Sequence, residues 1–260
     1  MQLSFAANFA LFKFLVEIHI SNVSMSTVNA ILQREDMEVT RTPRGLCEWV
    51  RIKTTELSET DEAKRYARSG ELLPKKFFEE IRPLCLFAQL RYGLDDGVWC
   101  TPKLGNDNYD ATIEFSDEYR SSVYVEITYA KDGYDESLRL EILSDKGLVN
   151  VLGRITKSGT KASGRRSISV ENEAVRHDEV RSNALNIVKE RILSKSSKKY
   201  GKNHILLVVV DDYIPFRFAE DKKMLEGLSK SVIEGARPDF RGVVLLGESG
   251  NYLACVYGEI

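Results

Sequence analysis

The sequence predicts a mixed α/β fold, in which a central sheet is flanked by helices. Three observations lead to this prediction. A helix-like segment over 75–92 is followed by three strand candidates within 97–129. A long amphipathic helix over 178–199 precedes a continuous aliphatic run over 205–210, a pattern typical of a strand buried on both faces. The segment 220–257 then supplies one more helix and two more strands.

The first helix of this core is expected to open at Pro74 and to end at Gly93. Pro83 should kink or restart it, because proline cannot donate a backbone hydrogen bond inside a helix. The preceding segment, 50–73, is polar and charged, so we expect a loop or a short exposed helix there. The helix itself has an apolar stripe at helical spacing, formed by Phe77, Phe78, Ile81, Leu84 and Leu90.

Three strands are expected next, over 97–103, 110–115 and 122–129. The third alternates apolar and polar residues with a period of two, which is typical of a half-buried strand. A turn signal over 116–118 separates the second strand from the third. These two strands should therefore pair as an antiparallel hairpin.

The segment 131–171 is rich in glycine, serine and basic residues, and it predicts only a short helix near 138–143 and a flexible basic loop over 157–166. Beyond the long helix and the buried strand, we expect a helix over 220–234. Two final strands over 243–246 and 252–257 should be joined by a turn. With 260 residues, we divide the chain into an N-terminal extension and peripheral segment, 1–73, and one α/β domain, 74–260.

The composition is that of an ordinary globular protein, with 43% hydrophobic and 29% charged residues and a formal net charge of −2. Net charge gives no hint of a nucleic-acid partner, but two basic stretches, 154–166 and 189–202, do. Each of them is equally compatible with a solvated surface. The first twenty residues are apolar but lack a basic start, and Lys13 and Glu17 interrupt them, so we expect neither a signal peptide nor a membrane span.

Four cysteines, Cys47, Cys85, Cys100 and Cys255, are widely spaced in the sequence. No CxxC pair occurs, which argues against a zinc site. We expect reduced core thiols in a cytoplasmic protein.

The strongest functional signal is a pair of carboxylates, Asp110 and Glu126, on the two strands of the hairpin. Glu126 lies between Val125 and Ile127, so its carboxylate is expected to be buried and to need a partner. A second carboxylate nearby requires a proton or a divalent cation between the two. Mg²⁺ or Mn²⁺ accepts such oxygen ligands. The alternatives are that Asp110 caps backbone amides and that Glu126 pairs across the hairpin with Arg120.

The expected order of elements is a helix, three strands, a helix and a strand, with an acid at the start of the second strand and a glutamate in the third. This pattern resembles the PD-(D/E)xK nuclease superfamily. The resemblance covers about 75–215 and implies a restriction-endonuclease-like αβββαβ core. Asp110 corresponds to the aspartate of the motif and Glu126 to the glutamate of ExK. Thr128 stands where the family has its lysine, and a threonine hydroxyl carries no charge.

The resemblance implies Mg²⁺- or Mn²⁺-dependent hydrolysis of DNA phosphodiester bonds. Its metal ligands would be Asp110, Glu126, the carbonyl of Ile127 and a glutamate of the first helix, Glu80 or its neighbour Glu79. The missing lysine would come from the long helix, as Lys189 or Lys195, or from Lys131 directly after the strand. Because Lys189 and Lys195 lie about 9 Å apart along a helix axis, only one of them should reach the metal.

Basic side chains would hold the phosphate backbone of a nucleic acid, namely Lys157, Lys161, Arg165, Arg166 and Lys198. Many nucleases of this kind act as homodimers, so a homodimer is also possible. His177 opens the long helix and is either a helix-start residue or an active-site contact. Tyr200 is expected to pack at the corner between helix and strand. The loss of the motif lysine leaves a second function open, a catalytically inactive nuclease fold that binds nucleic acid or protein.

Overall fold

The computed structural model describes residues 30–93, 95–105, 107–117, 119–150, 153–159, 167–171 and 174–260. Within them lies a mixed sheet of six strands in the order β1-β2-β3-β6-β7-β8. The mixed α/β class predicted from the sequence is therefore confirmed. The strands are β1 (Val98–Pro102), β2 (Ala111–Phe115), β3 (Val123–Tyr129), β6 (His204–Val210), β7 (Gly242–Gly247) and β8 (Leu253–Gly258).

The sheet changes from antiparallel to parallel pairing at β3. Strands β1, β2 and β3 pair antiparallel, as the hairpin prediction requires for the last two. Strand β6 lies parallel between β3 and β7, and β8 closes the edge antiparallel to β7. All seven residues of β6 are buried, which agrees with its continuous aliphatic sequence.

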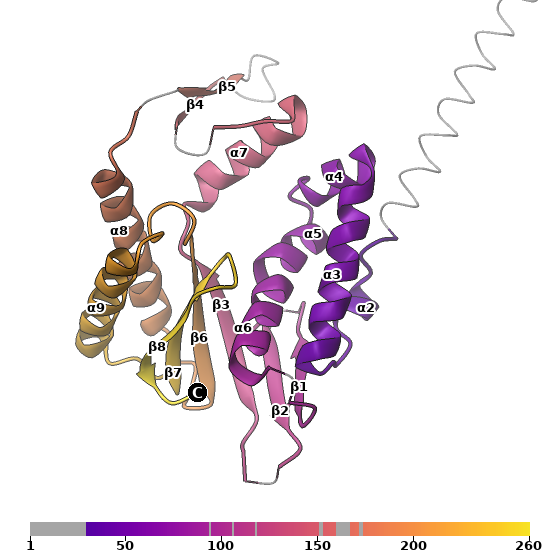
Figure 1. The fold of residues 1–260 in the computed structure, drawn as a ribbon, viewed down its shortest axis with the longest axis vertical. Helices are drawn as coiled ribbons and strands as arrows, with labels where there is room; N and C mark the ends of the chain where they lie inside the picture. Colours follow the sequence, from indigo (N-terminus) through magenta and orange to yellow (C-terminus); the bar gives the residue numbers. More distant parts are fainter. Residues whose placement is uncertain are drawn as a thin grey trace, which may run out of the picture.

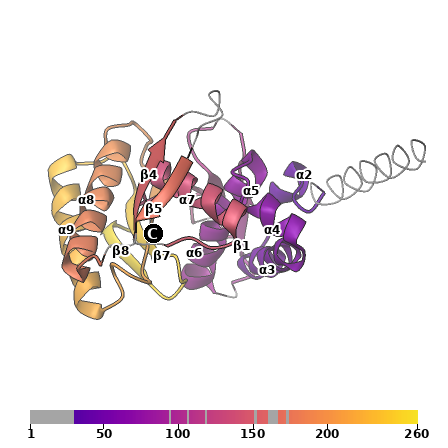
Figure 2. The same cartoon turned by 90° about the horizontal axis from the view of Figure 1, so that it is seen from above.

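Two layers of helices cover the two faces of the sheet (Figures 1 and 2). Helices α3 (Pro43–Glu59) and α6 (Arg82–Tyr92) lie on one face, and α8 (His177–Ser196) and α9 (Ala219–Ala236) lie on the other. The side chains of β6 alternate between the two layers. Ile205, Leu207 and Val209 belong to the cluster under α3 and α6, whereas the intervening Leu206, Val208 and Val210 pack with α8 and α9.

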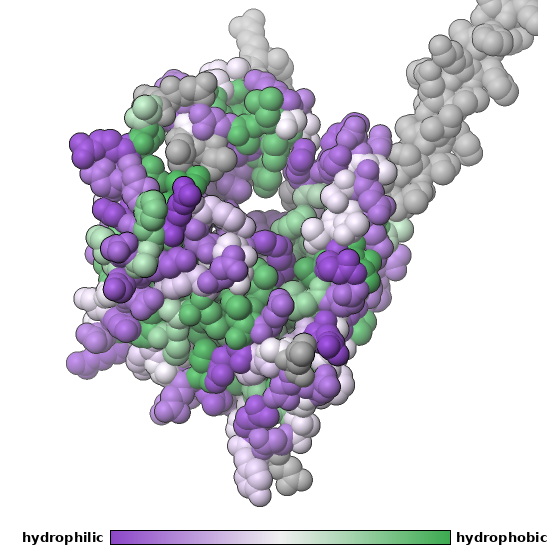
Figure 3. Space-filling model, viewed as in Figure 1, coloured by the Kyte–Doolittle hydropathy of each residue, from purple (hydrophilic) through white to green (hydrophobic). Residues whose placement is uncertain are grey.

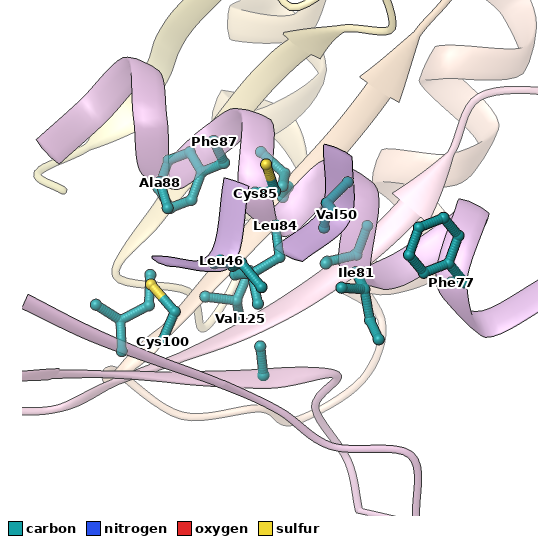
Figure 4. Packing of buried hydrophobic residues seen from close by; sticks show 14 of the residues in the cluster. Leu46, Val50, Phe77, Ile81, Leu84, Cys85, Phe87, Ala88, Cys100 and Val125 are labelled. Atoms are coloured by element: carbon teal, nitrogen blue, oxygen red, sulfur yellow. The ribbon is translucent and has the colours of Figure 1, made fainter. Parts of the chain in front are cut away.

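The segment expected as a loop or short exposed helix contributes to the core instead. Residues 50–73 contain the second half of α3, all of α4 (Asp61–Ala67) and the start of α5 (Leu72–Lys76), after the short helix α2 (Arg34–Met37). Buried apolar side chains on this segment join the same cluster as those beyond residue 74. Figure 4 shows Leu46 and Val50 of α3 close to Leu84, above Val125 of β3.

The first core helix contains an irregular turn that the sequence did not predict. It begins at Leu72 rather than at Pro74, and residues Phe77–Ile81 form a π-helical turn, η1. Pro83 stands at the start of α6, directly after this turn. Because π-turns often occur at functional positions, Glu80 within η1 is relevant to the site described below.

The basic segment between β3 and α8 is more regular than expected. Helix α7 (Gly133–Lys146) is longer than the helix predicted near 138–143. The loop predicted over 157–166 is wrong at its start, because residues Arg154–Ser158 form β4 and pair with β5 (Ser167–Glu171). Ile155 faces Val170 in this ribbon, so a short apolar alternation stabilises it. In Figure 1 the ribbon lies above α7, apart from the main sheet.

Across the residues that the structure describes, no helix combines the length and apolar character that crossing a membrane demands.

The central position of β6 leads to a stability prediction. Leu206 is fully buried between the sheet and α8, so Leu206→Ala should lower the free energy of unfolding by about 2–5 kcal/mol. Leu148 is 74% exposed, and Leu148→Ala should change it by less than about 0.5 kcal/mol. Urea unfolding of both variants measures the difference. Equal effects would contradict the assignment of β6 as the centre of the core.

Candidate functional site

Asp110 extends the β2–β3 pairing by one residue, and it uses its side chain to do so. Its backbone N–H donates to the carbonyl of Val125 at 2.8 Å. Its Oδ2 atom accepts the backbone N–H of Ile127, also at 2.8 Å. Strand β2 begins only at Ala111, so the carboxylate takes the place of a backbone carbonyl in the ladder. This bond fixes the Asp110 side chain against β3.

Glu126 lies across the hairpin from Asp110, because Ala111 is paired with Val125 in the antiparallel register. Glu126 is only 7% exposed. The Nζ atom of Lys195 donates to its Oε1 atom, and the hydroxyl of Tyr200 donates to the same oxygen at 3.3 Å. The buried carboxylate therefore has the charged partner that its environment demands.

Arg120 does not fill this role, although pairing across the hairpin was an alternative prediction. Its guanidinium donates to Asp117 at 2.8 Å, within the turn of the hairpin.

The last turn of α8 supplies the lysine at the site. Lys195 follows the buried side chains of Val188 and Ile192 on one face of the helix, at the spacing i, i+4, i+7. Lys189 lies six residues before Lys195, which corresponds to about 240° around the helix axis. Lys189 is exposed, and this angle places it off the helix face that carries Lys195. Of the two α8 lysines named from the sequence, the fold thus brings only Lys195 to the carboxylates.

Glu80 approaches the pair from the other helix layer, within the π-turn η1. Its Oε1 atom accepts from Lys76 Nζ at 2.5 Å, while its Oε2 atom is buried and has no hydrogen-bond partner among the described residues. Burial, and secondarily the charge of Asp110, raise the pKa of Glu80 to about 7. Its neighbour Glu79 faces Lys75 at 3.9 Å.

Asp110 is also a weaker acid in this environment than an exposed aspartate. Burial raises the pKa of Asp110 to about 6. The N–H of Ile127 acts against this shift, and the charge of Glu126 adds to it. Three carboxylates therefore share one region, and two of them hold protons more tightly than an exposed carboxyl does. Lys76 and Lys195 are the cations that compensate them.

The oxygen donors at this site suit a divalent cation chemically, but they supply only part of a complete ligand shell. The unpartnered Glu80 Oε2 and the raised pKa values indicate excess carboxylate oxygen, which Mg²⁺ or Mn²⁺ accepts. The Ile127 carbonyl lies at the same strand edge as its N–H, on the side of Asp110. No group of three or more histidine, cysteine or acidic side chains is close enough to hold a metal in the described ranges.

Thr128 is half-buried and lines a cleft of about 950 Å³ together with Glu80 and Ile127. The cleft lies between α4, α5 and η1 on one side and α7 on the other, and Figure 3 shows a hollow at this position. Lys131 lines the same cleft, but its Nζ atom is paired with Glu248 at 2.7 Å. The third candidate lysine is therefore occupied by a different carboxylate.

The basic residues named as phosphate contacts are not gathered at the carboxylates. Lys157 lies on β4, with its Nζ atom 5.6 Å from the ring centre of Tyr134 in α7. Lys198 is exposed directly after α8, close in sequence to Lys195. Lys161, Arg165 and Arg166 lie outside the described residues.

The sequence missed several residues near the site. Tyr200 was expected only to pack, and Lys76 was not considered, although its i, i+4 spacing to Glu80 is a recognisable signal for an ion pair. A row of aromatic rings continues from Asp110, in which Tyr109 and Tyr124 are 4.6 Å apart and Tyr124 and His204 are 4.9 Å apart. Only the folded sheet brings these rings together.

The fold places His177 away from the carboxylates. Its Nε2 atom lies 3.1 Å from the carbonyl of Ile214 and 3.7 Å from Asp221. It stands at the start of α8, whereas Glu126 meets the last turn of that helix, so the helix-start interpretation is the one the geometry supports.

Comparisons of the chain with protein-family models, with curated proteins and with solved structures found no match.

The raised pKa of Asp110 predicts how stability depends on pH in the presence of EDTA. A carboxyl whose folded pKa lies above its ordinary value favours folding at low pH, and this contribution is lost as pH rises through about 6. Asp110→Asn keeps an acceptor for the Ile127 N–H but cannot ionise. Its melting temperature should exceed that of the wild type by a few degrees at pH 7.5 and match it near pH 4.

Asp117→Asn provides a control of opposite sign. The N–H of Tyr119 and the side chain of Arg120 lower the pKa of Asp117, so its ionised form favours the folded state above the ordinary carboxyl pKa. The asparagine variant should be slightly less stable than the wild type at pH 7.5. Thermal melts of both variants across pH 4–8 test the prediction, and parallel curves for Asp110→Asn and wild type would contradict it.

Proposed function

We propose that this protein is a metal-dependent nuclease that hydrolyses phosphodiester bonds in DNA at the site formed by Asp110 and Glu126. One observation carries the proposal. Lys195 reaches the buried Glu126 from α8, and it supplies next to the carboxylates the positive charge that Thr128 lacks. This contact supports the proposal that the lysine of the motif is supplied by the helix instead of the strand, next to the same carboxylates.

In this proposal, Asp110, Glu126 and the Ile127 carbonyl would hold Mg²⁺ or Mn²⁺, and Glu80 would add an oxygen from η1. The metal would lower the pKa of a bound water and neutralise charge at the scissile phosphate. The bond between Asp110 and the Ile127 N–H holds one carboxylate in place, and Tyr200 holds the other. Both carboxyls must be ionised to bind a cation, so cation affinity should rise with pH.

Lys195 is proposed to stabilise the negative charge that develops on the phosphate during hydrolysis. Its contact with Glu126 orders the ammonium group before the substrate binds, which limits the reorganisation required. Thr128 lines the neighbouring cleft and can hydrogen-bond water there. Lys189, which faces solvent, has no part in this mechanism.

Single-stranded DNA is the substrate that the surroundings of Asp110 fit best. Tyr109 and Tyr124 are half-buried beside the carboxylate, with ring centres 4.6 Å apart and planes tilted by 40°. Aromatic side chains of this kind bind unpaired bases by stacking. Lys198 offers a phosphate contact near Lys195. The more distant Lys157 would contact a longer strand, and a homodimer stays a prediction from the family resemblance.

A second function, a nuclease fold that binds nucleic acid without cutting it, has one observation in its favour. The two ion pairs Lys195–Glu126 and Lys76–Glu80 already neutralise carboxylates that a metal would otherwise compensate. In such a protein the same residues would stabilise the fold and the aromatic and basic surface would bind the strand.

The two lysines of α8 provide a matched test of the nuclease proposal. Wild-type protein with Mg²⁺ or Mn²⁺ should cleave single-stranded or plasmid DNA, and Glu126→Gln should abolish the cleavage. Lys195→Met should reduce the rate by about 10²–10³, because it removes one charge from the transition state. Lys189→Met on the same helix should leave the rate unchanged. Wild-type cleavage that survives in Glu126→Gln, or an equal loss in both lysine variants, would refute the assigned site.

Binding to a labelled single strand in EDTA separates the two functions. Tyr109→Ala should weaken binding about tenfold or more, because one stacking contact is worth about 1–3 kcal/mol. Tyr119→Ala is the matched control, since Tyr119 is 98% exposed in the hairpin turn and should have little effect. Tyr109-dependent binding without cleavage by the wild type would favour the binding protein over the nuclease. Equal effects of the two tyrosine variants would remove the stacking surface from both proposals.

A further inference from the structure

Two cysteines that are 38 residues apart in the chain meet between helices α3 and α6. Their Sγ atoms, on Cys47 and Cys85, are 2.7 Å apart. The Cys47 thiol also lies 3.3 Å from the backbone carbonyl of Cys85. The sequence predicted reduced core thiols, and all four cysteines are free, although Cys255 is exposed rather than in the core. The contact between Cys47 and Cys85 was not predicted, and it arises from the packing of α3 on α6.

The two sulfurs differ in exposure and in acidity. Cys85 is 4% exposed and belongs to the hydrophobic cluster drawn in Figure 4, while Cys47 is only half-buried. The Cys85 thiol donates to the Cys47 sulfur, and this bond lowers the pKa of Cys47. The same bond and burial raise the pKa of Cys85. Cys47 is therefore the sulfur that a dissolved oxidant meets first, in its more reactive form.

We propose that Cys47 and Cys85 form a redox modification site, at which a hydroperoxide converts the thiol pair into a disulfide between α3 and α6. The contact geometry carries this proposal, and it does not depend on the proposed nuclease activity. Neither sulfur is needed for the carboxylate site.

The chemistry takes two steps and transfers two electrons from the thiols to the peroxide. In the first step the Cys47 sulfur attacks one oxygen of hydrogen peroxide, the O–O bond breaks, and Cys47 sulfenic acid and water form. In the second step the Cys85 sulfur attacks the Cys47 sulfur, the S–O bond breaks, and a second water leaves with the Cys85 proton. The sum is two thiols and one peroxide giving one disulfide and two waters.

The disulfide would join two helices that carry the same part of the core. It would close a loop that contains most of α3, then α4, α5, η1 and the start of α6, and closing a loop of this length restricts the unfolded chain. Helix α6 continues directly from the π-turn that holds Glu80, so the link would also restrain that segment. A rise of several degrees in melting temperature is the expected signature.

The test is non-reducing peptide mapping of the wild-type protein after brief treatment with hydrogen peroxide. We expect a Cys47–Cys85 linked peptide that has lost two hydrogen atoms, and a higher melting temperature that dithiothreitol reverses. Cys255 is exposed and Cys100 is buried, so they serve as internal references for access of the oxidant.

A second variant separates the two chemical steps. In Cys85→Ser the sulfenic acid on Cys47 cannot be resolved and should accumulate as a dimedone adduct. Oxidation of Cys255 while Cys47 and Cys85 both stay thiols would overturn the proposal. A disulfide that joins Cys47 to Cys100 instead would overturn it as well.

Discussion

The burial of β6 on both faces is the constraint on which the rest of the structure depends. A strand whose seven residues are all buried needs a helix layer on each side and a paired strand at each edge. Helices α3 and α6 provide one layer and α8 and α9 the other. Strand β3 occupies the edge of β6 that leads to the antiparallel hairpin. The carboxylates thus lie where the parallel part of the sheet meets its antiparallel part.

Electrostatics at the site follow from this position. Glu126 belongs to a strand that is largely buried, so its negative charge needs a compensating positive charge from the protein. Lys195 in the last turn of α8 supplies that charge. Asp110 lies one residue outside β2 and replaces a backbone acceptor. Glu80 comes from a π-turn, which rotates its side chain relative to a regular helix. Glu126 is thus positioned by a helix lysine, Asp110 by a backbone N–H and Glu80 by a π-turn.

The fold class and most elements could be predicted because their signals are local. The period of two in 122–129 and the aliphatic run of 205–210 are sufficient for β3 and β6. The sequence left Lys189 and Lys195 as alternatives, because the choice requires knowing that the face of α8 with Val188 and Ile192 meets the sheet. Tyr200 on Glu126 and Cys47 on Cys85 could not be predicted, because nothing in their neighbouring residues encodes contacts across 74 and 38 positions.

The charge that compensates Glu126 comes from helix α8, and this position restricts which sequence changes the helix tolerates. Thr128 is half-buried in β3, where a β-branched residue suits the strand. Helix α8 has a stricter requirement, because the position of Lys195 depends on the helix geometry. One residue inserted or deleted between Ile192 and Lys195 would turn the ammonium about 100° around the axis and shift it about 1.5 Å along it. The contact between Lys195 and Glu126 therefore requires that the length of α8 before Lys195 be preserved.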